Sequence, residues 1–93
     1  LPYVFGKTKI SNFIAFTKII TKSKFNFEEI SELYFFPSGR WDIKNNKGIL
    51  IKLPETNLLK ALNLAYHITI NEIFKNDKVI DLRIYNHVIS TNE

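Results

Sequence analysis

Residues 30–53 alternate apolar and polar side chains in three short runs, and this pattern constrains the fold most. The runs are ISELYFF, WDIK and ILIKL, separated by PSGR and NNKG. A two-residue period is typical of strands with one buried face, and glycine-containing turns can join such strands as hairpins. The pattern therefore predicts a three-stranded antiparallel meander that stops at Pro54. Its predicted core residues are Trp41, Ile43, Ile49 and Ile51, with Phe35 and Phe36 beside them.

Helical spacing replaces alternation before the meander. Ser11 or Asn12 can cap a helix that we expect to end near Ser23, since serine and asparagine are favoured at that position. A single apolar stripe would face the sheet. The stripe comprises Phe13, Phe16 and Ile20, with Ile14 and Thr17 beside them.

A second helix is predicted after the meander. Thr56 or Asn57 can cap it, and its pattern is clear to about His67. The β-branched ITI that follows predicts a kink, with a short helical turn over residues 71–74. The apolar face of the main helix comprises Leu58, Leu59, Leu62, Ala65 and Tyr66.

The last extended segment is VIDLRIYNHVIS, which alternates again. Asn86 and His87 would form either a bulge or a tight turn before the segment continues to Ser90. The order of elements predicts one α+β domain over residues 1–93, with a single sheet and helices packed on one face. That sheet would hold the meander and one C-terminal strand.

The length and composition of the chain exclude several classes of protein. At 93 residues and 45% hydrophobic content, the chain suits one folded domain. No apolar run reaches the roughly 18–20 residues needed to cross a bilayer, and no segment resembles a signal peptide. The chain begins at Leu1 rather than methionine, so we expect it to be a piece of a longer protein.

Little in the sequence supports a catalytic or metal-binding role. The absence of cysteine excludes disulfides and thiolate nucleophiles. His67 and His87 lie in different predicted elements without metal-ligand spacing. Asp81 and Arg83 fall on one strand face and can pair there. We therefore expect no enzyme, with no catalytic residue, metal or cofactor.

A net charge of +4 leaves nucleic-acid binding open as an alternative function. A small basic α+β domain with exposed aromatic rings can stack bases. The aromatic run LYFFPSGRW lacks the glycine-flanked basic pattern of RNA-recognition strands, however, and the lysines are spread along the chain, densest from Lys18 to Lys24.

The terminal strand indicates partner binding. A strand that arrives last often lies at a sheet edge, where unpaired N–H and C=O groups can receive another strand. This segment carries more apolar surface than an edge strand without a partner needs, at Ile84, Tyr85, Val88 and Ile89. The alternative is that this strand is central and these side chains belong to the core.

The order of several short motifs resembles the FtsQ/DivIB family of bacterial cell-division proteins. These motifs are LPYVFG at the start, RWDI, NNKGILIKLPE, a leucine-rich helix and VIDLRIYNHV. The resemblance implies a non-enzymatic divisome scaffold that binds FtsB and FtsL. It also implies a single-span inner-membrane protein whose POTRA domain and following β-domain lie on the periplasmic side at the septum. This chain would be the β-domain, without the tail, span and POTRA domain. Membrane anchoring is then expected only through the missing N-terminal span.

The resemblance also implies where the partner binds. In this family the last strand of the β-domain receives a strand of FtsB. The DLR motif matches Asp81, Leu82 and Arg83, and the residues that follow match by position. The implied partner-binding residues are Arg40, Arg83, Ile84, Tyr85, Asn86, Val88, Ile89 and Ser90.

Overall fold

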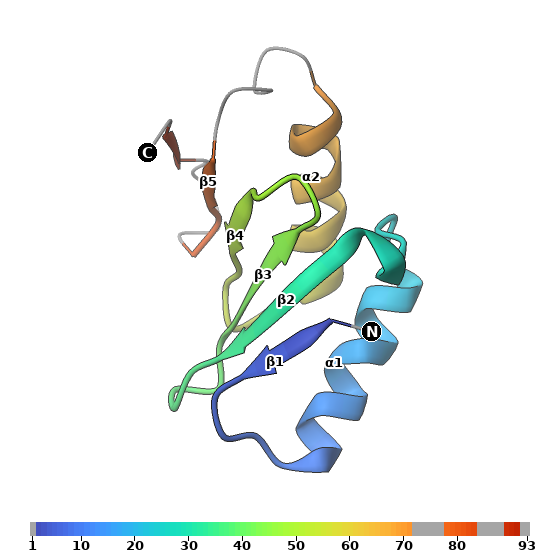
Figure 1. The fold of residues 1–93 in the computed structure, drawn as a ribbon, viewed down its shortest axis with the longest axis vertical. Coiled ribbons are helices and arrows are strands. Elements are labelled where there is room, and N and C mark those ends of the chain that lie inside the picture. Colours follow the sequence, from blue (N-terminus) through green and yellow to red (C-terminus); the bar gives the residue numbers. More distant parts are fainter. Residues whose placement is uncertain (1, 72–77, 84–88, 92–93) are drawn as a thin grey trace.

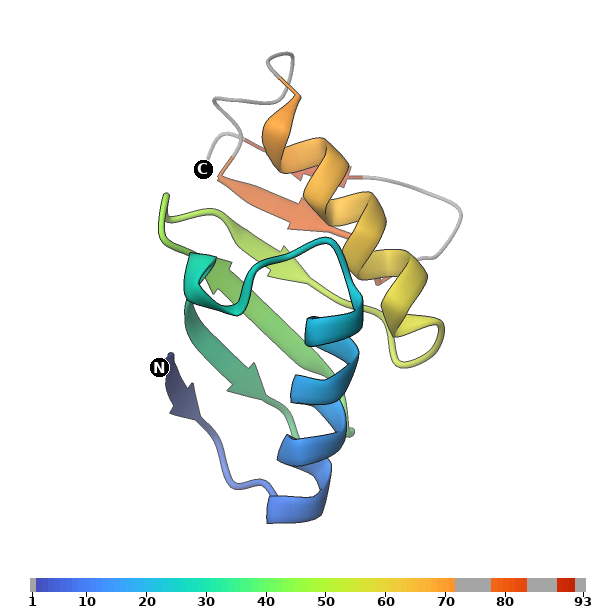
Figure 2. The ribbon, with the colours of Figure 1, turned by 90° about the vertical axis from the view of Figure 1, so that its right-hand side faces the viewer.

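The computed structural model describes residues 2–71, 78–83 and 89–91. One six-stranded sheet runs in the order β1-β2-β3-β4-β5-β6. Helices α1 and α2 lie side by side on the same face of that sheet, and the other face carries no helix in the described part of the chain (Figures 1 and 2). The predicted α+β class, with one sheet and helices on one face, is confirmed.

The predicted meander forms the middle of the sheet. Its strands pair antiparallel, with Leu33 opposite Ile43 and Ile43 opposite Ile51. Gly39 and Gly48 close its two turns with φ angles of 92° and 84°. Such angles suit glycine, which has no Cβ to clash. The strands are β2 (Ile30–Phe35), β3 (Trp41–Asn45) and β4 (Leu50–Lys52).

Three further short strands extend the meander on both sides. β1 (Tyr3–Phe5) pairs parallel with β2, and β5 (Val79–Asp81) pairs parallel with β4. β6 (Ile89–Thr91) pairs antiparallel with β5. Parallel neighbours need a crossover connection, and the two helices supply it. The helices therefore join β1 to β2 and β4 to β5 across the same face.

Helix α1 spans Ile10–Lys22. Lys9 occupies its N-cap position without a side-chain hydrogen bond, so the predicted cap at Ser11 or Asn12 is wrong. The helix starts earlier because the Lys9 carbonyl already accepts a hydrogen bond from the Phe13 N–H at 3.1 Å. The predicted end is confirmed, since the Ser23 N–H donates to the carbonyls of Ile19 and Ile20.

Helix α2 spans Leu58–Ile70, with Asn57 at its N-cap position in a left-handed conformation (φ 56°). The Asn57 side chain makes no cap hydrogen bond. The predicted kink after His67 is wrong, because the helix continues through Ile70 and buries Ile68. Asn71 is extended, and the rest of the predicted turn, residues 72–77, lies outside the described residues.

The core fills the space between the helices and one sheet face. Trp41, Ile43, Ile49 and Ile51 are buried, as predicted. Phe35 packs on Trp41 with ring centroids 4.8 Å apart. The core placement of Phe36 is wrong, because it follows Phe35 by one residue and strand alternation sends it to the opposite face. The helices contribute Phe16, Ile20, Leu62 and Ala65. The placement of Ile14 and Leu59 on the apolar helix faces is wrong, because these side chains are 45% and 40% exposed.

Within the described residues, neither helix is long and apolar enough to cross a membrane.

Candidate functional site

The last strand of the chain lies at one end of the sheet. β6 has β5 as its neighbour and no described strand on its other side. The single predicted C-terminal strand is therefore two strands, and β5 lies inside the sheet between β4 and β6. The alternation from Ile80 to Arg83 is confirmed, since Ile80 and Leu82 are buried. A two-residue period is the same whether the chain continues or reverses, so the pattern could not reveal the split.

Hydrogen bonds between β4 and β5 establish which way the β5 backbone points. The Leu50 N–H donates to the Lys78 carbonyl, and the Leu82 N–H donates to the Lys52 carbonyl, both at 2.8 Å. Successive residues of a strand direct their backbone groups to opposite sides. Val79 and Asp81 therefore direct theirs toward β6.

The register of β6 then identifies the backbone groups on the free edge. Asp81 lies opposite Ile89, and Val79 lies opposite Thr91. These are the pairs whose backbone groups face each other. Ser90, opposite Ile80, directs its N–H and C=O away from β5. The free edge of β6 thus presents the donor and acceptor of Ser90.

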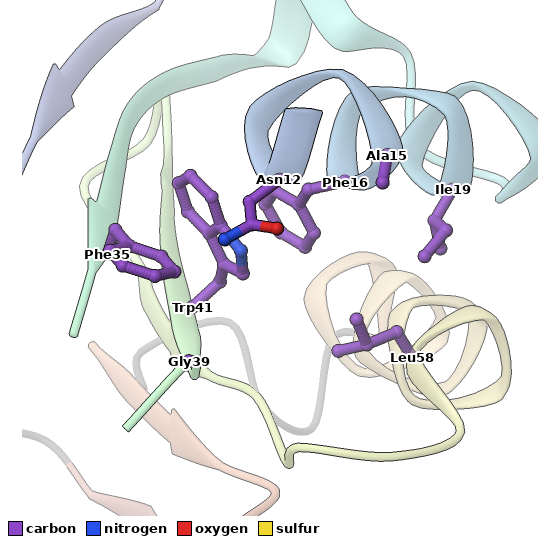
Figure 3. A pocket seen from close by; sticks show the side chains of 8 residues that line it. All are labelled: Asn12, Ala15, Phe16, Ile19, Phe35, Gly39, Trp41 and Leu58. Atoms are coloured by element: carbon purple, nitrogen blue, oxygen red, sulfur yellow. The ribbon is translucent and has the colours of Figure 1, made fainter. Parts of the chain in front are cut away.

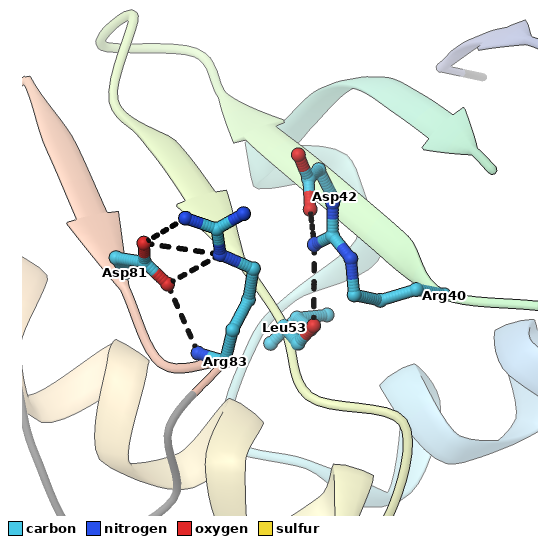
Figure 4. A network of polar contacts seen from close by, with 5 residues as sticks. All are labelled: Arg40, Asp42, Leu53, Asp81 and Arg83. Carbon is cyan, nitrogen blue, oxygen red and sulfur yellow. Dashed lines mark hydrogen bonds and ion pairs between the residues drawn. The ribbon is translucent and has the colours of Figure 1, made fainter. Parts of the chain in front are cut away.

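Beside this edge, the helix-free face of the sheet carries a row of charges. Asp42 of β3 lies opposite Lys52 of β4, and Lys52 lies opposite Asp81 of β5. Arg40 and Arg83 each lie two residues from one of these carboxylates and fold over it (Figure 4). We call these five residues the charge row. It combines three cations (Arg40, Lys52 and Arg83) with two carboxylates (Asp42 and Asp81).

Arg40 is held by contacts within the domain. Its Nη1 donates to Asp42 Oδ1 and, at 3.3 Å, to the Leu53 carbonyl. Its guanidinium carbon lies 4.5 Å from the centroid of the Phe36 ring. Asp42 is only 3% exposed. Burial raises the pKa of Asp42 above its ordinary value, although Arg40 acts in the opposite direction.

Arg83 is more accessible. Its side chain is 47% exposed, against 15% for that of Arg40. Its Nε donates to both carboxylate oxygens of Asp81, at 2.9 and 3.0 Å, and its backbone N–H donates to Oδ1 at 3.0 Å. The hydrogen bonds from the Arg83 side chain lower the pKa of Asp81. The predicted pairing of Asp81 with Arg83 is confirmed.

The structure brings part of the predicted partner-binding set together. Arg40 and Arg83 lie on the same face, and Ile89 and Ser90 belong to the edge strand. Ile84, Tyr85, Asn86 and Val88 lie outside the described residues.

Asp42 and Lys52 also belong to the charge row, although they were not among the residues predicted from the sequence. The spacing of Arg40 and Asp42, two residues apart on one strand face, is the same signal that identified Asp81 with Arg83. Lys52 carries no such local signal, because it reaches both carboxylates through strand register.

A hollow of about 270 Å³ opens between the two helices and β3 (Figure 3). Its polar side-chain groups are the Asn12 amide and the Trp41 indole N–H, and the rest of its lining is apolar. A second hollow of about 190 Å³ on the helix-free face includes Asp42, whose carboxylate is already bound by Arg40. Among the described residues, no group of histidine or acidic side chains could hold a metal ion.

Comparison with known proteins agrees with the motifs. The family model described as "Cell division protein FtsQ/DivIB, C-terminal" matches residues 1–83. This match ends at Arg83, before the residues of the predicted interface that follow it. A search of curated proteins found no match. Because the family model covers most of the chain, the chain belongs to the FtsQ/DivIB family of cell-division proteins and contains their C-terminal domain.

Proposed function

We propose that this domain is a non-enzymatic divisome scaffold that binds FtsB- and FtsL-type proteins by adding a partner strand to β6. The observation that carries the proposal is the position of β6 at the end of the strand order, with the Ser90 backbone directed outward. An incoming strand would gain main-chain hydrogen bonds there. Family membership supports a partner among the division proteins.

Side chains near the edge would add specificity. Arg83 is exposed and adjoins the end of β5, so an acidic side chain of the partner can compete with Asp81 for it. Arg40 contributes through the charge row, since its guanidinium is bound to Asp42 and Leu53. Ile84, Tyr85, Asn86 and Val88 belong to the proposed interface by their position between Arg83 and β6.

We propose the same cellular setting for the whole protein. In it, this domain follows a membrane span and a POTRA domain and acts on the periplasmic side of the inner membrane, at the septum. Family membership supports the septal role.

The backbone geometry provides a direct test. Ser90→Pro removes the outward N–H of β6 but leaves the hydrogen-bonded positions at Ile89 and Thr91 unchanged. We expect this variant to remain folded and to lose binding to a peptide spanning the extended segment of the FtsB-type partner, measured by calorimetric titration. Ser90→Ala is the matched control, because it removes the hydroxyl and keeps the N–H.

Two further variants extend the test. Ile84→Asp and Val88→Asp should each weaken peptide binding in the same titration if these apolar side chains contact the partner beside β6. Normal peptide binding by folded Ser90→Pro would exclude strand addition at β6. Loss of binding by Ser90→Ala would mean that the side chain, rather than the backbone, contacts the partner.

A further inference from the structure

The positive charge of this chain is concentrated at one end of the fold. Residues 1–27 contain five lysines and no acidic residue, whereas all nine carboxylate side chains occur from Glu28 onward. The later part of the chain holds eight cations against those nine acids, so the net charge of +4 arises from the first 27 residues. Helix α1 makes up 13 of these residues.

Four exposed residues of α1 line up along its outer side. Ile10, Ile14, Lys18 and Lys22 are spaced four apart, so they follow one another along the helix. Ile10 is 77% exposed and Ile14 is 45% exposed. Lys7 and Lys9 are exposed immediately before the helix. We call these six residues the α1 row.

The lysines of the α1 row are available to a ligand. Within the described residues, none of Lys7, Lys9, Lys18 and Lys22 forms an ion pair or hydrogen bond through its side chain. Lys24, just beyond the helix, differs, because its Nζ lies 2.7 Å from His67 Nε2. No acidic side chain of the same helix lies beside the row to neutralise it.

The surface next to the α1 row is apolar. A hollow of about 300 Å³ is lined by Phe13, Thr17, Thr21 and Phe27. The two threonine hydroxyls donate to the carbonyls of Ile14 and Lys18 at 2.8 Å, so their hydrogen-bonding capacity is used within the helix. The hollow therefore has little polar character of its own.

We propose that the α1 row is a docking surface for an anionic lipid bilayer. Helices that lie in a membrane interface combine exposed aliphatic side chains with lysines, whose long stems reach the lipid phosphates. Ile10 and Ile14 would enter the headgroup boundary, and the neighbouring lysines would bind anionic headgroups. The positive charge of the four lysines complements the negative charge of the lipid headgroups, and this complementarity favours an anionic bilayer as the partner.

A nucleic acid fits this surface less well. Sequence-tolerant binding of single strands relies on aromatic rings and arginines that stack on bases. The α1 row contains neither, and its exposed isoleucines would be placed against phosphates. The exposed Phe5 ring of β1 stacks on Tyr34, at 5.0 Å between centroids, on the helix-free face of the sheet.

The α1 row lies at the other end of the molecule from the partner edge. Figure 2 shows α1 at the end of the sheet away from β5, and β6 lies beyond β5 in the strand order. Docking through α1 would leave the edge of β6 free. The inference does not depend on the proposed strand addition, and the two can fail separately.

Co-sedimentation with vesicles tests the proposal. We expect the wild-type chain to bind vesicles of phosphatidylcholine mixed with phosphatidylglycerol and not to bind vesicles of phosphatidylcholine alone. The bound chain should dissociate from the anionic vesicles as the salt concentration rises from about 50 to about 200 mM. Lys18→Glu with Lys22→Glu should lower binding by at least about tenfold. Ile10→Ser with Ile14→Ser should also weaken it. All four positions are exposed, so circular dichroism should show unchanged folding.

Matched controls locate the effect. Lys47→Glu with Lys78→Glu makes the same charge change at two exposed lysines away from α1. Leu59→Ser with Leu64→Ser makes the same apolar-to-polar change on α2, where both leucines are 40% exposed. Controls that bind like the wild type support the proposal. It is overturned if the wild type does not bind the anionic vesicles, if both lysine pairs matter equally, or if the chain binds single-stranded DNA through Lys18 and Lys22 but not the vesicles.

Discussion

The ring of Phe16 in α1 lies almost parallel to the indole of Trp41 in β3, with centroids 4.5 Å apart and planes 8° apart. Phe16 is 2% exposed and Trp41 is 4% exposed. The stack joins the helix layer to the central hairpin. The sole tryptophan is therefore part of the core and is not offered to a partner.

Phe16→Ala should remove about 3–5 kcal/mol from the free energy of unfolding, because it deletes a buried ring and leaves a cavity beside Trp41. Urea titration followed by tryptophan fluorescence measures the loss. Ile14→Ala on the same helix is the control and should change stability by no more than about 0.5 kcal/mol, since Ile14 is exposed. Equal losses in the two variants would contradict the assignment of Phe16 to the core.

Arg40→Met should cost about 3–5 kcal/mol, because the buried Asp42 carboxylate loses the cation that contacts it directly. The double variant Arg40→Met with Asp42→Leu should recover much of that loss, since replacing a whole buried pair by apolar side chains is often close to neutral. A double-mutant cycle on unfolding free energies measures the coupling. Additive effects would show that the two residues do not interact.

Asp42 and Asp81 should make opposite contributions to the pH dependence of stability. Asp81 has a lowered pKa, so its stabilising contribution is present above the ordinary value of 3.8 and is lost as pH falls through the folded-state pKa. Asp42 has a raised pKa, so its contribution is present below 3.8 and is lost as pH rises through the folded-state pKa.

Asparagine variants separate these contributions. Asp81→Asn should lose stability less steeply than the wild type on the acid side of 3.8, and Asp42→Asn should lose stability less steeply on the alkaline side. Unfolding free energies from about pH 2 to about pH 7 provide the measurement. Wild-type pH profiles in both variants would refute the assignment.

Gly6→Ala should destabilise the domain more than Gly48→Ala. Both glycines have positive φ angles, of 100° and 84°, which cost alanine about 1–2 kcal/mol. A Cβ at Gly6 would also overlap the backbone carbonyl oxygen of Phe35, whereas a Cβ at Gly48 meets nothing within 4 Å. Thermal unfolding of the two variants should show the larger decrease for Gly6→Ala, and equal decreases would mean that β1 does not pack closely on β2.

Alternation and helical spacing were sufficient to predict the meander, the two helices and the side chains of the hairpin core. These patterns are local, because burial on one face imposes a period on neighbouring residues wherever the segment lies. The same two-residue period predicted that Asp81 and Arg83 can pair on one strand face. The order of motifs around Trp41 and the DLR segment also led to the family.

Only the tertiary structure decided which strands are neighbours and in which direction they run. β1 joins β2 in parallel, and the segment after Arg83 returns as β6, because pairing depends on where the chain reverses and on partners distant in sequence. The alignment of Asp42, Lys52 and Asp81 in the charge row and the outward backbone of Ser90 follow from that register. The face of a strand or helix on which a side chain lies can thus be predicted from its own segment. Which strand forms the exposed edge of the sheet depends on the pairing of all the other strands.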